Sequence, residues 1–347
     1  MVNLKLKGKL LASGITVLVV PILILLLVML WQINSIQKIA ADESIRLAKT
    51  DLDHISQGVT SMLTTQHQLQ RKYIEAGLNL TKDVIRKSGG VSLDARATIG
   101  WDAKNQLTGE IKKVGLQRII IGGRVITQNT GFSEETPVVD QVKKLVGGTC
   151  TIFQRMNESG DMLRVATNVA NKENQRAIGT YVAAVNTDGT RNPVIASVMD
   201  GRRYMGRAFV VDAWYAAAYE PFRDGQGKIA GMLYYGVKEE EGASDVRRSI
   251  MDIKVGTTGY VYVLDSKGNY VISKDGKRDG ENIWDSKDAD GKRFIQDIVN
   301  AALRLGPNQI GETYYQWKNA GDAKARPKIV HFSYFAPWDW IIGVGVL

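Results

Sequence analysis

The chain has 347 residues, more than one ordinary domain needs, which predicts about two folded units together with non-globular segments. Its formal net charge of +9 comes from Lys and Arg interspersed with Asp and Glu, without a basic stripe interleaved with aromatic residues. This distribution argues against nucleic acid as a partner.

The first element expected is a membrane anchor. Residues 10–31 run without a charge, and about 20 apolar residues suffice to cross a bilayer as a helix. Lys5, Lys7 and Lys9 precede this span, and no positive charge follows it until Lys38. The positive-inside rule then predicts a cytoplasmic N-terminus and an extracytoplasmic remainder. A cleavable signal peptide is the alternative, but its apolar region is normally shorter and the sequence after Trp31 offers no convincing A-x-A site.

A long helix is predicted next, over residues 32–88, because residues 42–86 contain no proline and carry an apolar heptad pattern. Ser88-Gly89-Gly90 is expected to end this helix. Its apolar stripe could face a second copy of the chain, the chain's own modules, or both. The heptad positions are Ile45, Leu52, Val59, Tyr73 and Leu80, and Ala48, Ile55, Met62, Leu69 and Ala76.

A repeated strand pattern follows the helix. Gly148-Thr149 and Gly256-Thr257 each open an apolar strand that reaches a glycine-containing turn, which predicts a β-hairpin in each copy. Each copy also closes alike, with residues 218–237 in the first and 332–346 in the second forming a pair of apolar strands. Short helices are expected around 246–251 and 294–305. The fold class predicted is therefore α+β, with two modules that each hold a central antiparallel sheet.

These residues resemble the Cache superfamily, the PAS-like extracytoplasmic sensors of bacterial chemoreceptors, sensor kinases and cyclases. The blocks that carry the resemblance to a fused double-Cache sensor lie in 90–347: residues 164–168, 176–180, 206–210, 218–221, 259–265 and 337–343.

The resemblance implies a five-part chain in the bacterial inner membrane, crossing it once. The parts are a cytoplasmic N-terminus (1–9), a transmembrane helix (10–31), a long extracytoplasmic helix (32–88), a membrane-distal Cache module (89–240) and a membrane-proximal Cache module (241–347). It also implies a homodimer. The family pattern continues into a second membrane helix and a signalling region, and residues 341–347 are too short to span a bilayer. The chain is then either the sensory part of a longer receptor or a free-standing anchored sensor.

The expected ligand is a small carboxylate or amino acid, bound in the distal module. Arg207 is the candidate anion partner, because a guanidinium donates two parallel hydrogen bonds to a carboxylate. Aromatic side chains nearby would enclose the rest of the ligand: Tyr204, Trp214, Tyr215 and Tyr219. In the proximal module, an equivalent cavity could be lined by Tyr262, Ser273, Trp317, His331 and Tyr334, but each of these is better explained by core packing or strand structure.

The sequence contains no recognisable motif for catalysis or for metal binding. His54, His67 and His331 are scattered, and Cys150 stands alone in an apolar strand, where a small buried side chain is expected. Residues 286–291 fail as a calcium loop because Ser286 and Asp297 occupy its first and twelfth positions. Asp288 or Asp290 is expected to cap the following helix instead. No catalytic residue, metal or cofactor is predicted.

Sensing is thus the leading functional hypothesis. The alternative is a membrane-anchored structural or assembly protein that uses Cache modules for protein–protein interaction. A periplasmic hydrolase would need a nucleophile–base pair that the sequence does not show.

Overall fold

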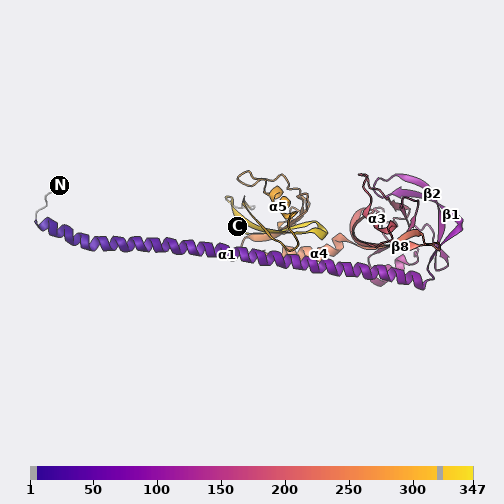
Figure 1. Ribbon diagram of the computed structural model, residues 1–347, viewed down its shortest axis with the longest axis horizontal. Coiled ribbons are helices and arrows are strands. Elements are labelled where there is room, and N and C mark those ends of the chain that lie inside the picture. Colours follow the sequence, from indigo (N-terminus) through magenta and orange to yellow (C-terminus); the bar gives the residue numbers. More distant parts are fainter. Residues whose placement is uncertain (1–5, 319–322, 347) are drawn as a thin grey trace. The chain divides into compact units, whose positions relative to one another are not determined.

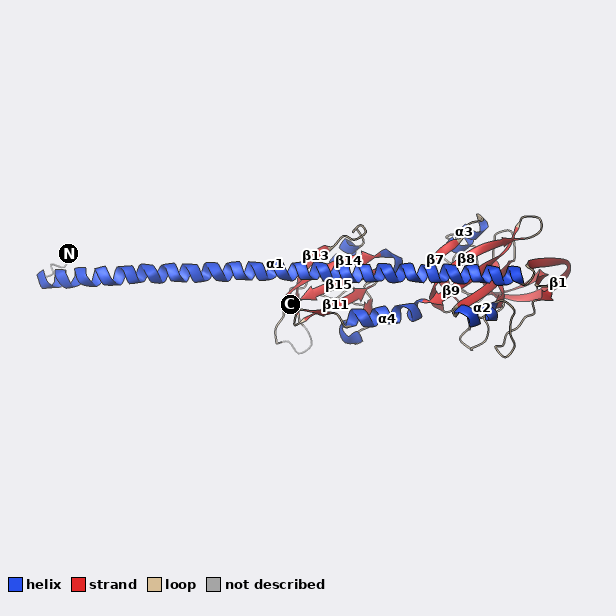
Figure 2. Cartoon of the chain, turned by 90° about the horizontal axis from the view of Figure 1, so that it is seen from below, coloured by secondary structure: helices blue, strands red, loops and turns tan. Residues whose placement is uncertain are grey.

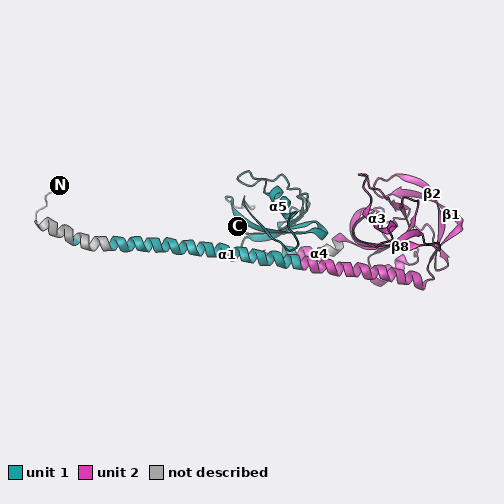
Figure 3. Ribbon diagram, viewed as in Figure 1, with its two compact units in different colours: residues 1–61, 250–347 teal, residues 62–249 magenta. Residues whose placement is uncertain are grey.

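The computed structural model describes the backbone of residues 6–318 and 323–346, and their side chains except those of 6–13, 15–21 and 240–243. Residues 1–5 of the predicted cytoplasmic segment lie outside this description. The chain divides into unit 1, Met1–Ser61 with Ile250–Leu347, and unit 2, Met62–Ser249 (Figure 3). The predicted α+β class is confirmed, with strands and helices in both units (Figure 2).

The N-terminal helix α1 covers Leu6–Lys87. It ends where expected: Gly89 and Gly90 have φ angles of 104° and 85°, in the left-handed region that glycine adopts without steric cost. Among the described residues, α1 is the one helix long and apolar enough to cross a membrane, and its large apolar side chains at 22–31 are exposed. Further along, Leu52 and Val59, two of the predicted heptad positions, are buried, with 0% and 2% of their surface exposed. Part of the predicted heptad stripe therefore packs against the chain itself.

Unit 2 contains a nine-stranded sheet in the order β3-β2-β1-β6-β5-β4-β9-β8-β7. All neighbours are antiparallel except the short parallel pair β1–β6. The strands are β1 (Val91–Asn105), β2 (Ile111–Ile121), β3 (Arg124–Val125), β4 (Thr149–Arg155), β5 (Met162–Thr167), β6 (Thr180–Val182), β7 (Tyr204–Val210), β8 (Ala213–Arg223) and β9 (Ile229–Lys238).

Two helices complete the core of unit 2 around this sheet. Helix α2 (Val139–Val146) packs on β4 and β5, and α3 (Pro193–Met199) packs on β7 and β8. Helix α1 packs on the same face as α2, where Gly77 admits the ring of Tyr235: a Cβ at Gly77 would lie 2.2 Å from Tyr235 Cε1. Helix α4 (Glu239–Met251) follows β9.

Unit 1 contains a six-stranded sheet in which β10-β11-β15-β14-β13 lie in this order and β12 pairs with β11. All of these pairs are antiparallel. The strands are β10 (Lys254–Val255), β11 (Gly259–Leu264), β12 (Tyr270–Ile272), β13 (Gly311–Trp317), β14 (Arg326–Phe335) and β15 (Trp340–Val346), and the helical segments are η1 (Lys274–Gly276), α5 (Phe294–Ala302) and η2 (Ala336–Trp338).

The two faces of the unit 1 sheet have different neighbours. Helix α5 covers one face, where Phe294 and Ile298 join the core, and α1 lies against the other (Figure 1). On the α1 side, Thr60 Oγ1 lies 3.1 Å from Ser333 Oγ of β14. Side chains that alternate along β14 thus reach either α1 or the α5 side.

The repeated pattern read from the sequence is confirmed in both units. Strands β4–β5 and β11–β12 form the two opening hairpins, and β8–β9 and β14–β15 form the two closing pairs. The expected cap of α5 is wrong, because Arg293 occupies the N-cap without a side-chain hydrogen bond. Asp288 Oδ1 instead accepts the backbone N–H groups of Asp290 and Lys292, and so closes the preceding turn.

Candidate functional site

The five predicted ligand contacts lie on two opposite faces of the unit 2 sheet. Arg207 and Trp214 share one face, with the Arg207 Cζ atom 4.2 Å from the centroid of the Trp214 ring. Tyr204, Tyr215 and Tyr219 point to the other face, because side chains alternate along β7 and β8. The structure therefore does not bring these five side chains into one cavity, and the sequence-based grouping around Arg207 is corrected.

Arg207 already has a partner of opposite charge. Its Nε donates to Glu239 Oε1 and Oε2 at 2.8 and 2.9 Å. The side chain is also 42% exposed, so water competes for its hydrogen bonds. A ligand carboxylate would have to replace Glu239 and would gain little by doing so.

The three tyrosines belong to a buried aromatic cluster on the face that α1 does not cover. The ring of Tyr219 lies 6.1 Å from that of Tyr204 and 5.0 Å from that of Tyr234. Burial raises the pKa of Tyr204, Tyr219 and Tyr234, which keeps these hydroxyls protonated and able to donate hydrogen bonds. Tyr204 uses its proton locally, donating to the Arg207 carbonyl oxygen at 2.7 Å.

Arg164 is the charged group of this cluster. It lies in β5, a strand whose side chains are all buried, and its own side chain is fully inaccessible to solvent. Its guanidinium stacks on Phe153, with Cζ 4.8 Å from the ring centroid. The hydroxyls of Tyr215, Tyr219 and Tyr234 are close enough to interact electrostatically with it.

The hydrogen bonds of Arg164 leave part of its guanidinium unused. Nη1 donates to Thr180 Oγ1 and Nη2 donates to Gln106 Oε1, while Nε is buried without a partner. Among the described residues, no carboxylate lies within 4.0 Å of the guanidinium. Burial lowers the pKa of Arg164, although a guanidinium still remains charged at neutral pH. A buried charge without a counter-ion costs on the order of several kcal/mol.

A second buried arginine in unit 2 shows how such a charge is satisfied for structural purposes. Arg176 Nη2 and Nη1 lie 2.7 and 2.9 Å from the two carboxylate oxygens of Asp140. Its remaining donors reach the backbone carbonyls of Gly131, Glu134 and Thr167. Arg164 has no such set of acceptors, which makes it the stronger candidate for an external anion.

A hollow of about 550 Å³ lies next to the Arg164 cluster. Gln106 and Thr180, which accept hydrogen bonds from Arg164, also form part of its wall. Lys104 and Lys172 line it further out. One layer of polar side chains therefore separates the guanidinium from a space large enough for a small ligand.

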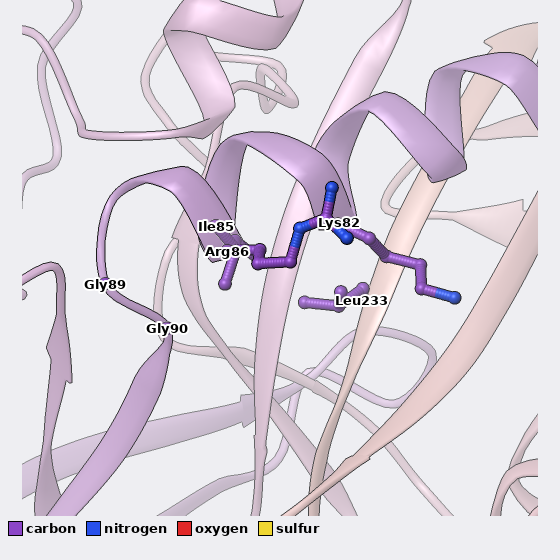
Figure 4. A pocket seen from close by; sticks show the side chains of 6 residues that line it. All are labelled: Lys82, Ile85, Arg86, Gly89, Gly90 and Leu233. Carbon is purple, nitrogen blue, oxygen red and sulfur yellow. The ribbon is translucent and has the colours of Figure 1, made fainter.

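Another hollow, of about 490 Å³, lies at the C-terminal end of α1 (Figure 4). Its two cations, Lys82 and Arg86, form ion pairs with Glu220 and Asp83, at 2.5 and 3.0 Å. These pairs make it a weaker candidate for an anion than the Arg164 cluster.

Of the proximal candidates, Tyr262 and Trp317 lie on the α5 side of the unit 1 sheet, and His331 lies on the α1 side. Arg164 is not among the site residues predicted from the sequence. The available signal was a single charge inside an otherwise apolar run, Met162-Leu163-Arg164-Val165-Ala166.

Solved structures similar to the chain are sensory domains at low identity. The ligand-binding domain of the Campylobacter jejuni chemoreceptor Tlp3 in complex with 4-methylisoleucine is 11% identical, with a TM-score of 0.44, over 87% of this chain and 91% of that one. A methyl-accepting chemotaxis protein from Vibrio parahaemolyticus is 22% identical, with a TM-score of 0.28, over 31% and 70%. A Cache chemosensory domain described for carboxylic acid recognition is 24% identical, with a TM-score of 0.28, over 31% and 71%.

A comparison with curated proteins finds no match. The family described as the Cache 3/Cache 2 fusion domain matches residues 37–347, which include both sheets, both pairs of hairpins and the Arg164 cluster. The chain therefore belongs to the Cache 3/Cache 2 fusion domain family.

Proposed function

We propose that the protein is the input domain of a membrane receptor, and that unit 2 recognises a small carboxylate through Arg164. The observation that carries this proposal is the buried guanidinium without a carboxylate partner and with an unused Nε. A ligand carboxylate would supply the missing counter-ion through charge-assisted hydrogen bonds. The tyrosine and phenylalanine rings around it would enclose the apolar part of the ligand.

Membrane coupling in this proposal uses α1. Its apolar segment would cross the bacterial inner membrane once, with the N-terminus in the cytoplasm and both units outside. Ligand binding would favour one of two arrangements of the unit relative to its own stretch of α1, because a ligand shifts an equilibrium only through unequal affinity for the two states. No catalytic step is part of this role.

Homodimerisation through α1 belongs to the same proposal. Leu69 and Ala76 of the predicted heptad are exposed, and Ile45 is exposed on the same stripe. A second copy of the chain would cover these side chains by parallel helix pairing.

The decisive experiment compares Arg164→Met with Arg207→Met in the detergent-solubilised full chain. A panel of amino acids and short organic acids is first screened by thermal shift, since a ligand of the native state raises the melting temperature. Calorimetry with the best compound should then show a loss of affinity of about ten- to a hundredfold in Arg164→Met. Arg207→Met should bind as the wild type does.

Arg164→Lys separates charge from geometry, because an ammonium keeps the charge but not the planar fork, and it should also bind poorly. The assignment fails if Arg164→Met binds normally while Arg207→Met does not. If no compound stabilises the wild type and partner proteins bind instead, the structural or assembly role is the better one.

A further inference from the structure

Unit 1 contains a buried lysine in its sheet, on the strand next to the edge strand β13. Lys328 lies in β14, opposite Tyr315 of β13, and its side chain is 1% exposed. It points to the α5 side of the sheet, because His331, three residues further on, points to α1. Lysine is among the residues least often buried without a partner.

Four aromatic rings surround the ammonium group, and we name this set of residues the Lys328 cage. The distances from Lys328 Nζ to the ring centroids are 3.9 Å for Tyr260, 5.5 Å for Tyr262, 5.6 Å for Trp317 and 5.9 Å for Tyr315. Cation–π attraction offsets part of the loss of hydration. It does not supply a counter-ion.

No carboxylate lies within 4.0 Å of Lys328 Nζ among the described residues. Burial lowers the pKa of Lys328 to about 7, and repulsion from the exposed Lys274, whose Nζ lies 5.4 Å from the Tyr260 ring centroid, acts in the same direction. The Tyr262 hydroxyl is also buried, and although it faces the Tyr315 hydroxyl it completes no hydrogen bond. The Lys328 ammonium therefore lacks a counter-ion, and the Tyr262 hydroxyl can still donate a hydrogen bond.

Strand β15 leaves space for these two groups. A Cβ at Gly345 would lie 2.6 Å from Lys328 Cε, and a Cβ at Gly343 would lie 2.2 Å from Tyr262 Cζ. Any larger residue at either position would displace the lysine or the tyrosine. The strand thus accommodates a buried polar pair where an apolar residue such as Met would fill the core at lower cost.

Unit 2 has the same combination at Arg164. In each unit the sheet face away from α1 carries one buried cation, aromatic rings around it and no carboxylate partner among the described residues. The cations differ in type and come from different strands, β5 and β14. A buried cation without a counter-ion destabilises a protein core that holds no ligand. Because both units contain such a cation, we expect the two cations to have the same role.

We propose that the Lys328 cage is a second binding site, which takes a short monocarboxylate independently of the Arg164 site. The carboxylate would pair with Lys328 and accept a hydrogen bond from Tyr262. The four rings already face the Lys328 ammonium group, and among the described residues no carboxylate lies within 4.0 Å of Nζ to pair with the ammonium group of an amino acid. The cage therefore favours a ligand in which the carboxylate is followed by a short apolar chain.

Calorimetry on the detergent-solubilised full chain tests the proposal, with sodium propionate as the probe and propionamide as its uncharged counterpart. Wild type, Lys328→Met and Arg164→Met are compared near pH 7 in two buffers of different protonation enthalpy. Binding at Lys328 should take up roughly half a proton, because the carboxylate holds the ammonium form of a group that titrates near this pH. Arg164 stays protonated and contributes no uptake.

The expected result is that Lys328→Met removes the proton-linked binding, with affinity falling at least about a hundredfold, while Arg164→Met retains it. Lys267→Met, which removes an exposed charge of the same unit, should behave as the wild type. Lys328→Met should fold at least as stably, because an apolar side chain replaces a buried charge.

Proton-linked propionate binding that survives in Lys328→Met would overturn the proposal, as would a wild type that binds no propionate with proton uptake. Failure at Arg164 gives a different pattern, in which Arg164→Met equals the wild type for every ligand. A marked loss of stability in the unliganded Lys328→Met would identify the lysine as a structural group and would likewise overturn the proposal.

Discussion

The Oδ1 atom of Asp53 in helix α1 lies 2.7 Å from the Nδ1 atom of His331 in strand β14. A carboxylate can only accept, so Nδ1 carries the hydrogen. The same strand presents Lys328 to the opposite face of the sheet. Strand β14 therefore contacts the proposed cage on one side and α1 on the other, which gives binding in unit 1 a direct physical route to the helix.

Replacing Asp53 should loosen this contact. Asp53→Ala removes a hydrogen bond to a buried ring and leaves the His331 donor without its acceptor, which costs about 1 kcal/mol. Amide hydrogens of α1 near residue 53 should then exchange about fivefold faster, as measured by mass spectrometry. Asp51→Ala, two residues away and exposed, is the matched control and should exchange at the wild-type rate.

Cys150 should be inert in the folded protein. It is fully buried, with its Sγ 3.5 Å from Thr81 Oγ1 of α1, and burial raises the pKa of its thiol to about 12. Since the thiolate is the reactive form, a thiol reagent at pH 8 should label the native protein at a negligible rate and label one equivalent after denaturation. Rapid labelling of the native protein would show that unit 2 opens readily around β4.

The sequence predicted the elements better than the site, for a physical reason. Glycine pairs and apolar periodicity are local signals, so the end of α1 at Lys87 and the hairpins beginning at Thr149 and Gly259 followed from short stretches of chain. The sequence favours Arg207 as the anion partner because this residue neighbours aromatic residues along the chain. In a strand, however, neighbours in sequence point to opposite faces, and this separates Arg207 from Tyr215 and Tyr219.

Arg164 and Lys328 could not be assigned from sequence alone because their unusual feature is a missing partner. A buried charge can be paired only if a carboxylate from a distant part of the chain folds against it. Asp140 pairs with Arg176 in this way. The one local signal, the lone cation within an apolar run at Arg164, is shared by the edge strands of many sheets, and Lys328, which follows Arg326 and Pro327, lacks even this signal. Only the burial of the side chain and the register of the strands distinguish a solvent-exposed cation of an edge strand from a buried cation without a carboxylate partner.

The exposed heptad positions on α1 provide a test of dimerisation. Leu69→Asp places a charge where a second copy would pack, and should shift the detergent-solubilised protein from dimer to monomer in sedimentation equilibrium. Gln68→Asp adds the same charge one residue away on an exposed position and should leave the dimer intact. Substitutions at Leu52 or Val59 would be poor tests, because both are buried within the chain's own unit. A wild type that stays monomeric at high concentration contradicts the proposal.

Stability should depend on pH through Lys328. Its pKa is about 7 in the folded protein against an ordinary value of 10.5, so between these values the unfolded chain binds more protons than the native one. Stability therefore rises with pH across this window, by about 2 kcal/mol from pH 7 to pH 9, at a limiting slope of about 1.4 kcal/mol per pH unit. Urea unfolding of the wild type and of Lys328→Met at both pH values isolates this contribution, since other titrating groups are common to the two proteins. The curve of the wild type should climb toward that of Lys328→Met as the pH rises. Parallel curves would mean that the lysine is ionised in the native state as freely as it is in water.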